Sequence, residues 1–175
     1  NRIMNGAMVI DQRNAGASVT IGSANGLYTL DRYSWYTSQA SKLSTQQSST
    51  APTGFTKSML ITSLSAYTPI SGDYFFVRQG IEGFNIADLA WGTANAATVT
   101  LSFWVRSSLT GTFGGQLLSS NSAYAYVYSY TINNANTWEQ KTITITGPTT
   151  GTFNTDNTAG VFVSFTLASA RTVAS

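Results

Sequence analysis

The stretch "TVTLSFWVR", residues 98–106, alternates apolar and polar side chains with a period of two. Such alternation is typical of a β-strand that buries one face, because successive side chains of a strand point to opposite sides. The buried face would carry Val99, Leu101, Phe103 and Val105. The pattern recurs in "WEQKTITIT" (138–146) and "GVFVSFTL" (160–167), whose inward side chains would be Ile143, Ile145, Val161, Val163, Phe165 and Leu167.

Six further segments are rich in β-branched and aromatic residues, which brings the predicted strands to nine. They span residues 8–13, 18–22, 27–35, 57–63, 73–81 and 124–132. Turns are expected where glycine, asparagine and proline gather, at residues 14–17, 23–26, 51–54, 70–73, 110–115, 133–136 and 146–151. Beyond one helical turn in a structured loop within residues 80–92, no helix is expected. Short strands separated by turns predict an all-β fold of two antiparallel sheets packed as a sandwich.

The chain has 175 residues, of which 9% are charged, and a net charge of +2. This length predicts a single domain over residues 1–175, and the start at Asn1 predicts a piece of a longer protein. Nucleic acid is not expected as a partner, because its binders cluster lysine and arginine, whereas here the basic residues are scattered. No apolar run reaches the roughly 18 residues that span a bilayer, so no membrane insertion is expected.

Histidine and cysteine are absent, which removes the usual catalytic triads and the preferred zinc ligands. Among the seven carboxylates a glycosidase pair is arithmetically available, for example Glu82 with Asp88. A plainer interpretation is favoured, in which Glu82 and Asp88 cap backbone amides of their loop, Asp73 lies in a turn and Glu139 shares a strand face with Lys141. No catalytic residue is therefore assigned, and the protein is predicted not to be an enzyme.

Cofactors are not expected either, since the sequence contains no nucleotide-binding fingerprint. A structural Ca²⁺ held by carboxylates and loop carbonyls stays an open alternative, with Asp11 and Asp156 as the candidate ligands. Their spacing is not diagnostic, so no metal ligand is assigned.

Aromatic residues are the remaining feature with binding chemistry. Alternate positions of segment 124–132 are tyrosines that would project from one side of a strand: Tyr124, Tyr126, Tyr128 and Tyr130. Three tryptophans would extend that surface: Trp35, Trp91 and Trp104. One interpretation is a platform on which sugar rings stack. The other, which is favoured because cross-strand aromatic pairs are ordinary sheet stabilisers, is a tyrosine ladder packed against a second subunit or the facing sheet.

Four stretches together also resemble a known family. They are "NRIMNGAMVIDQRNAGASVTI" (1–21), "YTLDRY" (28–33), "GDYFFVRQGIEGFNIADLAWGTANAATVTLSFWVRSSLTGTFGG" (72–115) and "YTINNANTWEQKTITITGPTTGTFNTDNTAGVFVSFTL" (130–167). They resemble a domain common in virion proteins of tailed bacteriophages, tail-fibre-like and other appendage proteins among them. That domain is in turn similar to the jelly-roll carbohydrate-binding modules of glycan-degrading enzymes.

The resemblance implies a non-catalytic jelly roll displayed on the virion as a symmetric oligomer, for which a trimer is expected. Its partners would be other virion proteins, with host-surface polysaccharide as a further expected contact. The place on the particle, whether tail, fibre or head decoration, stays open. The alternative function is a carbohydrate-binding module of a larger enzyme or adhesin.

One departure from the family pattern concerns the end of the chain. The pattern runs on past "FTLASA" (165–170) to a further strand, whereas here "RTVAS" (171–175) follows and the sequence ends. Either that strand is absent or another segment replaces it, and an open sheet edge would then need a partner. The loop with Phe84, Leu89 and Trp91 is expected to cover one end of the sandwich core or to meet a neighbouring subunit.

Overall fold

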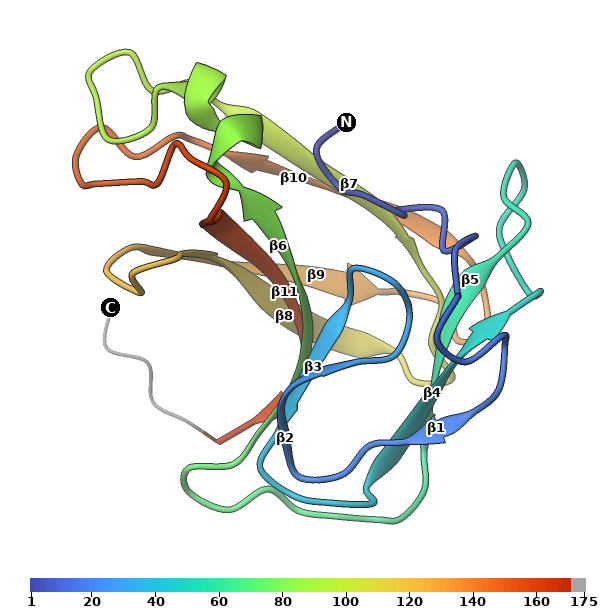
Figure 1. The fold of residues 1–175 in the computed structure, drawn as a ribbon. Coiled ribbons are helices and arrows are strands. Elements are labelled where there is room, and N and C mark those ends of the chain that lie inside the picture. Colours follow the sequence, from blue (N-terminus) through green and yellow to red (C-terminus); the bar gives the residue numbers. More distant parts are fainter. Residues whose placement is uncertain (171–175) are drawn as a thin grey trace. The chain divides into compact units, whose positions relative to one another are not determined.

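The structure is a computed structural model that describes residues 1–170 and contains eleven strands and two 3-10 turns (Figure 1). The strands are β1 (Val19–Thr20), β2 (Ala24–Tyr28), β3 (Ser34–Thr37), β4 (Leu43–Ser48), β5 (Ser58–Ser63), β6 (Tyr74–Glu82), β7 (Val99–Val105), β8 (Gly111–Ser119), β9 (Ala125–Ile132), β10 (Glu139–Ile145) and β11 (Ala159–Ser169). The 3-10 turns, η1 (Gly83–Asn85) and η2 (Ala87–Leu89), follow β6. Within residues 1–170, no helix is long and apolar enough to span a membrane.

The strands form three sheets, in the orders β1-β4-β5, β10-β7 and β2-β3-β6-β11-β8-β9. Neighbouring strands pair antiparallel, with β7 and β10 matched over their full length from Val99↔Ile145 to Val105↔Glu139. The predicted all-β fold with antiparallel sheets in a sandwich-like arrangement is confirmed, but the strands form three sheets where two were expected. The expected departure after residue 170 concerns residues that lie outside those described.

The chain divides into two compact units, and β6 and β11 contribute to both. Unit 1 comprises Asn1, residues 3–79 and, of the described residues at the end of the chain, 166–170. Its buried apolar side chains come from both of its sheets, with Leu43 on β4, Trp35 on β3, and Phe75 and Val77 on β6. Trp35 is fully buried, and its indole N–H donates to the Thr29 hydroxyl at 3.0 Å.

Unit 2 comprises Arg2 and residues 80–165. Within it the β7–β10 pair faces β9 and β11, because the ring of Phe103 on β7 lies 5.0 Å from the rings of Tyr130 and Phe165. This unit is therefore a small sandwich with its own core, formed by Leu117, Tyr128, Ile132, Ile145, Val161 and Val163. The prediction of one domain over residues 1–175 stays a prediction, since compactness of two units does not decide whether they fold as one.

The strands with clear alternation were predicted most accurately. The exposure of β7 alternates at every residue as expected, and β10 alternates up to the buried Ile145. On β11, Val161 and Val163 are buried as predicted, but Leu167 is 39% exposed, so its inward assignment is wrong. The helical turn expected within residues 80–92 is present as η1 and η2.

Residues 8–13 were predicted as a strand, but residues 8–11 have irregular backbone and residues 12 and 13 begin a turn. Met8 adopts a positive φ of 56°, which a strand does not accommodate. The Asn5 side chain bonds both the amide and the carbonyl of Ile10, and Gln47 donates to the Met8 carbonyl at 2.6 Å. Side-chain amides thus take the hydrogen bonds that a neighbouring strand would have supplied.

Three other boundaries also differ from the prediction. Segment 27–35 is divided between β2 and β3 by a turn that contains Arg32 at φ 76°. The glycine-rich stretch 110–115, expected as a turn, forms the first half of β8, and part of the expected turn 23–26 lies in β2. Strand β4, "LSTQQS", was missed because its side chains are mostly polar and their burial does not alternate.

Candidate functional site

Unit 2 contains a pocket of about 140 Å³ that is lined largely by aromatic and aliphatic side chains. Its walls are half-buried and include Trp91, Tyr124 and Phe153. Its rim includes Tyr126, which is 40% exposed. None of the residues that line the pocket is charged. They are Trp91, Leu117, Ser119, Tyr124, Ala125, Tyr126, Ile145, Thr146, Pro148, Phe153 and Val161. A concave apolar site with a few polar groups is the usual form of a small-molecule site.

Three glycines allow the loops around the pocket to approach closely. A Cβ on Gly151 would lie 2.1 Å from the ring of Tyr124, and one on Gly147 would lie 2.7 Å from the indole of Trp91. A Cβ on Gly92 would lie 2.2 Å from the carbonyl oxygen of Gly151. Any larger residue at these positions would push the aromatic walls apart, so the glycines fix the shape of the pocket.

The aromatic walls also hold one another. The ring of Phe153 lies 5.7 Å from the ring of Trp91, edge to face, and 5.7 Å from the ring of Tyr124. The backbone N–H of Gly92 donates to the carbonyl of Pro148 at 2.8 Å, which ties the two loops together. Such ring pairs add about 0.5–1.5 kcal/mol each beyond the area that they bury.

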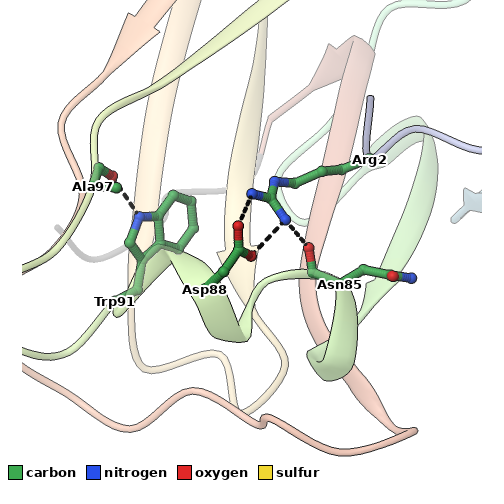
Figure 2. A network of polar contacts seen from close by, with 5 residues as sticks. All are labelled: Arg2, Asn85, Asp88, Trp91 and Ala97. Atoms are coloured by element: carbon green, nitrogen blue, oxygen red, sulfur yellow. Dashed lines mark hydrogen bonds and ion pairs between the residues drawn. The ribbon is translucent and has the colours of Figure 1, made fainter.

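An ion pair next to Trp91 anchors the η2 segment (Figure 2). The guanidinium of Arg2 donates to both carboxylate oxygens of Asp88, at 2.8 and 2.7 Å, and also bonds the Asn85 carbonyl. The indole N–H of Trp91 donates to the Ala97 carbonyl at 2.8 Å. The segment that carries the Trp91 wall is therefore held at both ends.

The floor of the pocket differs in polarity from its rim. Leu117, Ile145 and Val161 are all at most 7% exposed and form the floor. The buried hydroxyl of Ser119 is occupied, because it donates to Asn121 at 2.6 Å and accepts from the Tyr124 amide. Among the described residues, no hydrogen bond engages the hydroxyl of Tyr124. The floor thus offers carbon atoms, whereas the polar groups lie higher.

The four tyrosines of segment 124–132, three of which lie in β9, do not form one platform. Tyr124 and Tyr126 line the pocket, but Tyr128 is 4% exposed and Tyr130 packs against Phe103 and Phe113. The hydroxyl of Tyr128 crosses β8 and donates to the Ser164 carbonyl at 2.8 Å. Burial raises the pKa of Tyr128, and it raises that of Tyr130 to about 12. Tyr128 and Tyr130 therefore pack between the sheets, as the favoured interpretation of a ladder against the facing sheet expected, and they do not belong to a sugar platform.

The three candidate tryptophans lie in three different environments. Trp91 lines the pocket, whereas Trp35 is completely buried in unit 1 and its assignment to a binding surface is wrong. Trp104 is 39% exposed and belongs to the exposed face of β7, opposite the face of Phe103. The loop of Trp91 also contains the buried Leu89, as expected, but Phe84 is 68% exposed.

Sequence reasoning missed the pocket residues Pro148, Phe153, Leu117, Ile145 and Val161 as site residues. The alternation of apolar residues predicts Ile145 and Val161 only as core positions and does not single out Leu117. Such a pattern indicates burial, but it does not show whether a buried side chain also lines a pocket. The lone Phe153 after the glycine and proline stretch 146–151 was the available signal.

The carboxylates once considered for catalysis have structural partners. Asp88 pairs with Arg2, and this hydrogen bond lowers the pKa of Asp88. Glu82 precedes η1 but makes no side-chain cap there. Its carboxylate accepts a hydrogen bond from the side-chain amide of Asn85 at 3.2 Å. The expectation that Glu82 caps its loop is therefore wrong at η1, whereas a hydrogen bond from its own backbone amide also lowers the pKa of Asp88.

The side chains of both candidate calcium ligands accept hydrogen bonds from nearby residues of their own turns. Asp11 in unit 1 accepts from the backbone amides of Asn14 and Gly16, at 3.2 and 2.7 Å. Asp156 in unit 2 accepts from the amide and hydroxyl of Thr158, which lower its pKa. Across residues 1–170, no three acidic side chains gather in a way that could hold a metal ion.

Comparisons with known proteins agree with the β-rich fold. No protein-family model matches the chain, and no curated protein matches it significantly. Among solved structures, the chain is similar to the enzymatically active domain of tailspike protein 4 of bacteriophage CBA120, at 14% identity and a TM-score of 0.55. That match covers 95% of this chain but only 19% of the tailspike chain. At such low identity it shows a shared fold alone.

A second similarity is looser. The family 11 carbohydrate-binding module of a cellulosomal cellulase of Clostridium thermocellum matches at 19% identity and a TM-score of 0.37. The match covers 91% of this chain and 99% of that module. The chain is thus an all-β protein with antiparallel sheets and a small aromatic pocket in unit 2.

Proposed function

We propose that the chain is a non-catalytic jelly-roll domain of a bacteriophage virion, in a tail fibre, the tail or a head-surface appendage. It would serve assembly and contact host-surface glycans through the unit 2 pocket. The observation that carries the glycan contact is the uncharged pocket walled by Trp91, Tyr124 and Phe153. The virion location is supported by the resemblance of the four sequence stretches, and the tailspike similarity supports the fold only.

The pocket chemistry suits a neutral sugar. Aromatic faces stack on the apolar faces of sugar rings, and hydroxyl groups such as that of Tyr124 bond the sugar hydroxyls. No charged side chain lines the pocket, so a neutral ligand is not disfavoured by an unpaired charge.

The pocket size predicts weak binding at a single site. Its 140 Å³ lies well below the roughly 300–1,000 Å³ of pockets that enclose a drug-sized ligand. Only part of one sugar residue would be enclosed, so most of a polysaccharide would stay in solvent. A trimer would offset this weakness, because linked sites raise the overall avidity about 10²- to 10⁴-fold without new contacts.

Binding without bond cleavage fits the carboxylates of unit 2. A glycosidase needs a carboxylic acid with a raised pKa, whereas the pKa of Asp88 is lowered by Arg2. The pKa of Asp156 is likewise lowered, by hydrogen bonds from Thr158. We therefore assign no catalytic role to either residue.

The test is binding to a panel of purified bacterial surface polysaccharides, measured with the wild-type chain and with single variants. We expect Trp91→Ala and Tyr126→Ala to lower the affinity at least tenfold. Trp104→Ala is the matched control, because it removes a 39% exposed aromatic side chain away from the pocket. Equal affinity of all three variants and the wild type would contradict the proposed site.

The alternative function, a carbohydrate-binding module of a larger enzyme or adhesin, would use the same pocket. Oligomeric state separates the two functions, and size-exclusion chromatography with light scattering measures it. We expect a trimer. A strict monomer that still binds a polysaccharide column would favour the module.

A further inference from the structure

We propose that the unit 2 pocket is a receptacle for a small apolar substituent of a sugar, such as the methyl group of an N-acetyl group or of a 6-deoxy sugar. This inference deepens the proposed function and rests on it. It names which part of the glycan enters the pocket, and therefore which glycans are distinguished.

The floor of the pocket excludes hydroxyl groups. It consists of the side chains of Leu117, Ile145 and Val161, which are 7%, 1% and 3% exposed. The nearest polar side-chain groups are already engaged: the Ser119 hydroxyl with Asn121, and the Trp91 indole with the Ala97 carbonyl. A sugar hydroxyl on this floor would lose water, would find no free donor, and could reach at most the remaining lone pair of the Ser119 hydroxyl, which is unfavourable.

The volume of the pocket fits a small apolar group. A dry apolar cavity of about 150 Å³ accommodates a benzene molecule. At 140 Å³, the pocket offers room for a methyl or acetyl group together with the adjoining edge of a sugar ring. A whole disaccharide would not enter.

Polar groups at the rim would orient the rest of the sugar. The hydroxyls of Tyr124 and Thr146 have no hydrogen-bond partner within residues 1–170, and Thr146 is exposed. Tyr126 is 40% exposed, and its hydroxyl donates to the Thr144 carbonyl at 3.3 Å. An apolar floor below hydroxyls is complementary to a sugar whose methyl group points inward and whose hydroxyls point outward.

The first experiment compares pairs of sugars that differ in the methyl-bearing group. N-acetylglucosamine and glucose form one pair, and D-fucose and D-galactose form the other, all as free reducing sugars that carry no aglycone methyl group. NMR titration of the wild-type chain measures their affinities. We expect at least a tenfold preference for the methyl-bearing member of one pair, and the pair that shows it identifies the source of the methyl group.

Contacts are measured in the same samples. We expect intermolecular nuclear Overhauser effects between the ligand methyl protons and the methyl protons of Leu117, Ile145 or Val161. Equal affinity within both pairs, or bound sugars whose methyl protons show no such contact, would overturn the inference and leave the proposed function standing. Failure of every sugar and of the polysaccharide panel would overturn the proposed function and this inference with it.

A size series at Val161 provides an independent check. Val161→Ala enlarges the floor. If the N-acetyl pair shows the preference, we expect this variant to prefer an N-propionyl over an N-acetyl sugar. If the 6-deoxy pair shows it, we expect this variant to prefer the 6-C-methyl analogue over the 6-deoxy sugar, and the wild type keeps the smaller group in either case. Trp104→Ala should keep the wild-type preference, since Trp104 does not line the pocket. Thermal unfolding verifies that each variant is folded. If Val161→Ala is folded and keeps the wild-type preference, the assignment of the floor is overturned. If Val161→Ala does not fold, the wild-type sugar affinities and the NOE contacts described above test the inference on their own.

Discussion

Gly115 is required beneath the ring of Tyr128. A Cβ at position 115 would lie 2.2 Å from the Ser164 carbonyl oxygen and 2.4 Å from the Tyr128 hydroxyl. The missing side chain lets Tyr128 cross β8 and bond β11 at 2.8 Å. One glycine thus permits a bridge across three strands of the unit 2 sheet.

Gly115→Ala is therefore expected to destabilise the protein. Overpacking of this kind lowers the free energy of unfolding by about 1–3 kcal/mol, and the hydrogen bond of Tyr128 would be strained or lost as well. Urea denaturation measures the change. Gly22→Ala is the control, because a Cβ there meets no atom within 4 Å. A Gly115→Ala variant as stable as Gly22→Ala would contradict the packing described for Tyr128.

For single residues, the sequence predicted which face of a strand a side chain points to, but not whether that side chain is buried. That Tyr124, Tyr126, Tyr128 and Tyr130 share one side of a strand follows from their spacing. Whether each lies between sheets or at a rim depends on residues far away in the sequence, such as Gly115, Gly151 and Phe153. No local pattern contains that information.

The η2 segment is positioned by a residue more than eighty positions earlier in the chain, Arg2. The pair with Asp88 is exposed, with side-chain exposures of 34% and 70%, so it contributes little to global stability. Its effect is local instead. The ion pair and the bond to the Asn85 carbonyl restrain the turn from which Trp91 projects.

Arg2→Ala is expected to loosen this turn without unfolding the protein. We expect faster hydrogen exchange at the amides of Leu89 and Ala90, which donate to the carbonyls of Ile86 and Ala87. We also expect a severalfold weaker affinity for the sugar bound at Trp91. Lys57→Ala is the control, because Lys57 makes no hydrogen bond or ion pair within residues 1–170. Unchanged exchange and unchanged affinity in Arg2→Ala would show that the ion pair does not position the pocket.

Elements were predictable where local alternation and burial agreed, as in β7 and β10. They were not predictable where side chains replace strand neighbours, as Asn5 and Gln47 do around residues 8–10. Glycine in β8 was interpreted as a turn, although at position 115 it is present to make room for the Tyr128 ring. The same residue type thus serves turns and close packing, and only tertiary contacts separate the two uses.

At the scale of the whole molecule, stability is expected to fall on acidification. The Glu139 carboxylate bonds Lys141 at 2.6 Å and the amides of Asn133 and Asn134 at 2.9 and 2.8 Å. These bonds, with Lys141 first, lower the pKa of Glu139 from 4.5 to about 2. In unit 1, hydrogen bonds from Tyr67, Gln39, Ile70 and Ser38 hold the pKa of Asp73 well below its ordinary value.

Both groups bind a proton less readily in the folded than in the unfolded chain. Their contribution is therefore complete above about pH 4.5 and is lost as the pH falls towards 2. Urea midpoints between pH 7 and 2 should decline over this window, and Glu139→Gln should flatten the decline while lowering stability at pH 7. If the urea midpoint of Glu139→Gln declined as steeply with falling pH as that of the wild type, Glu139 would not be a source of the acid sensitivity.

The central claim is that the unit 2 pocket is the glycan-binding site, and the four tryptophan indoles test it directly. A ¹H–¹⁵N NMR titration of the wild-type chain with a surface polysaccharide follows Trp35, Trp91, Trp104 and Trp138 separately. The account predicts that the Trp91 indole signal shifts in a saturable manner while those of Trp35 and Trp104 stay in place. Saturable binding that shifts the Trp104 signal and leaves Trp91 unmoved would contradict it.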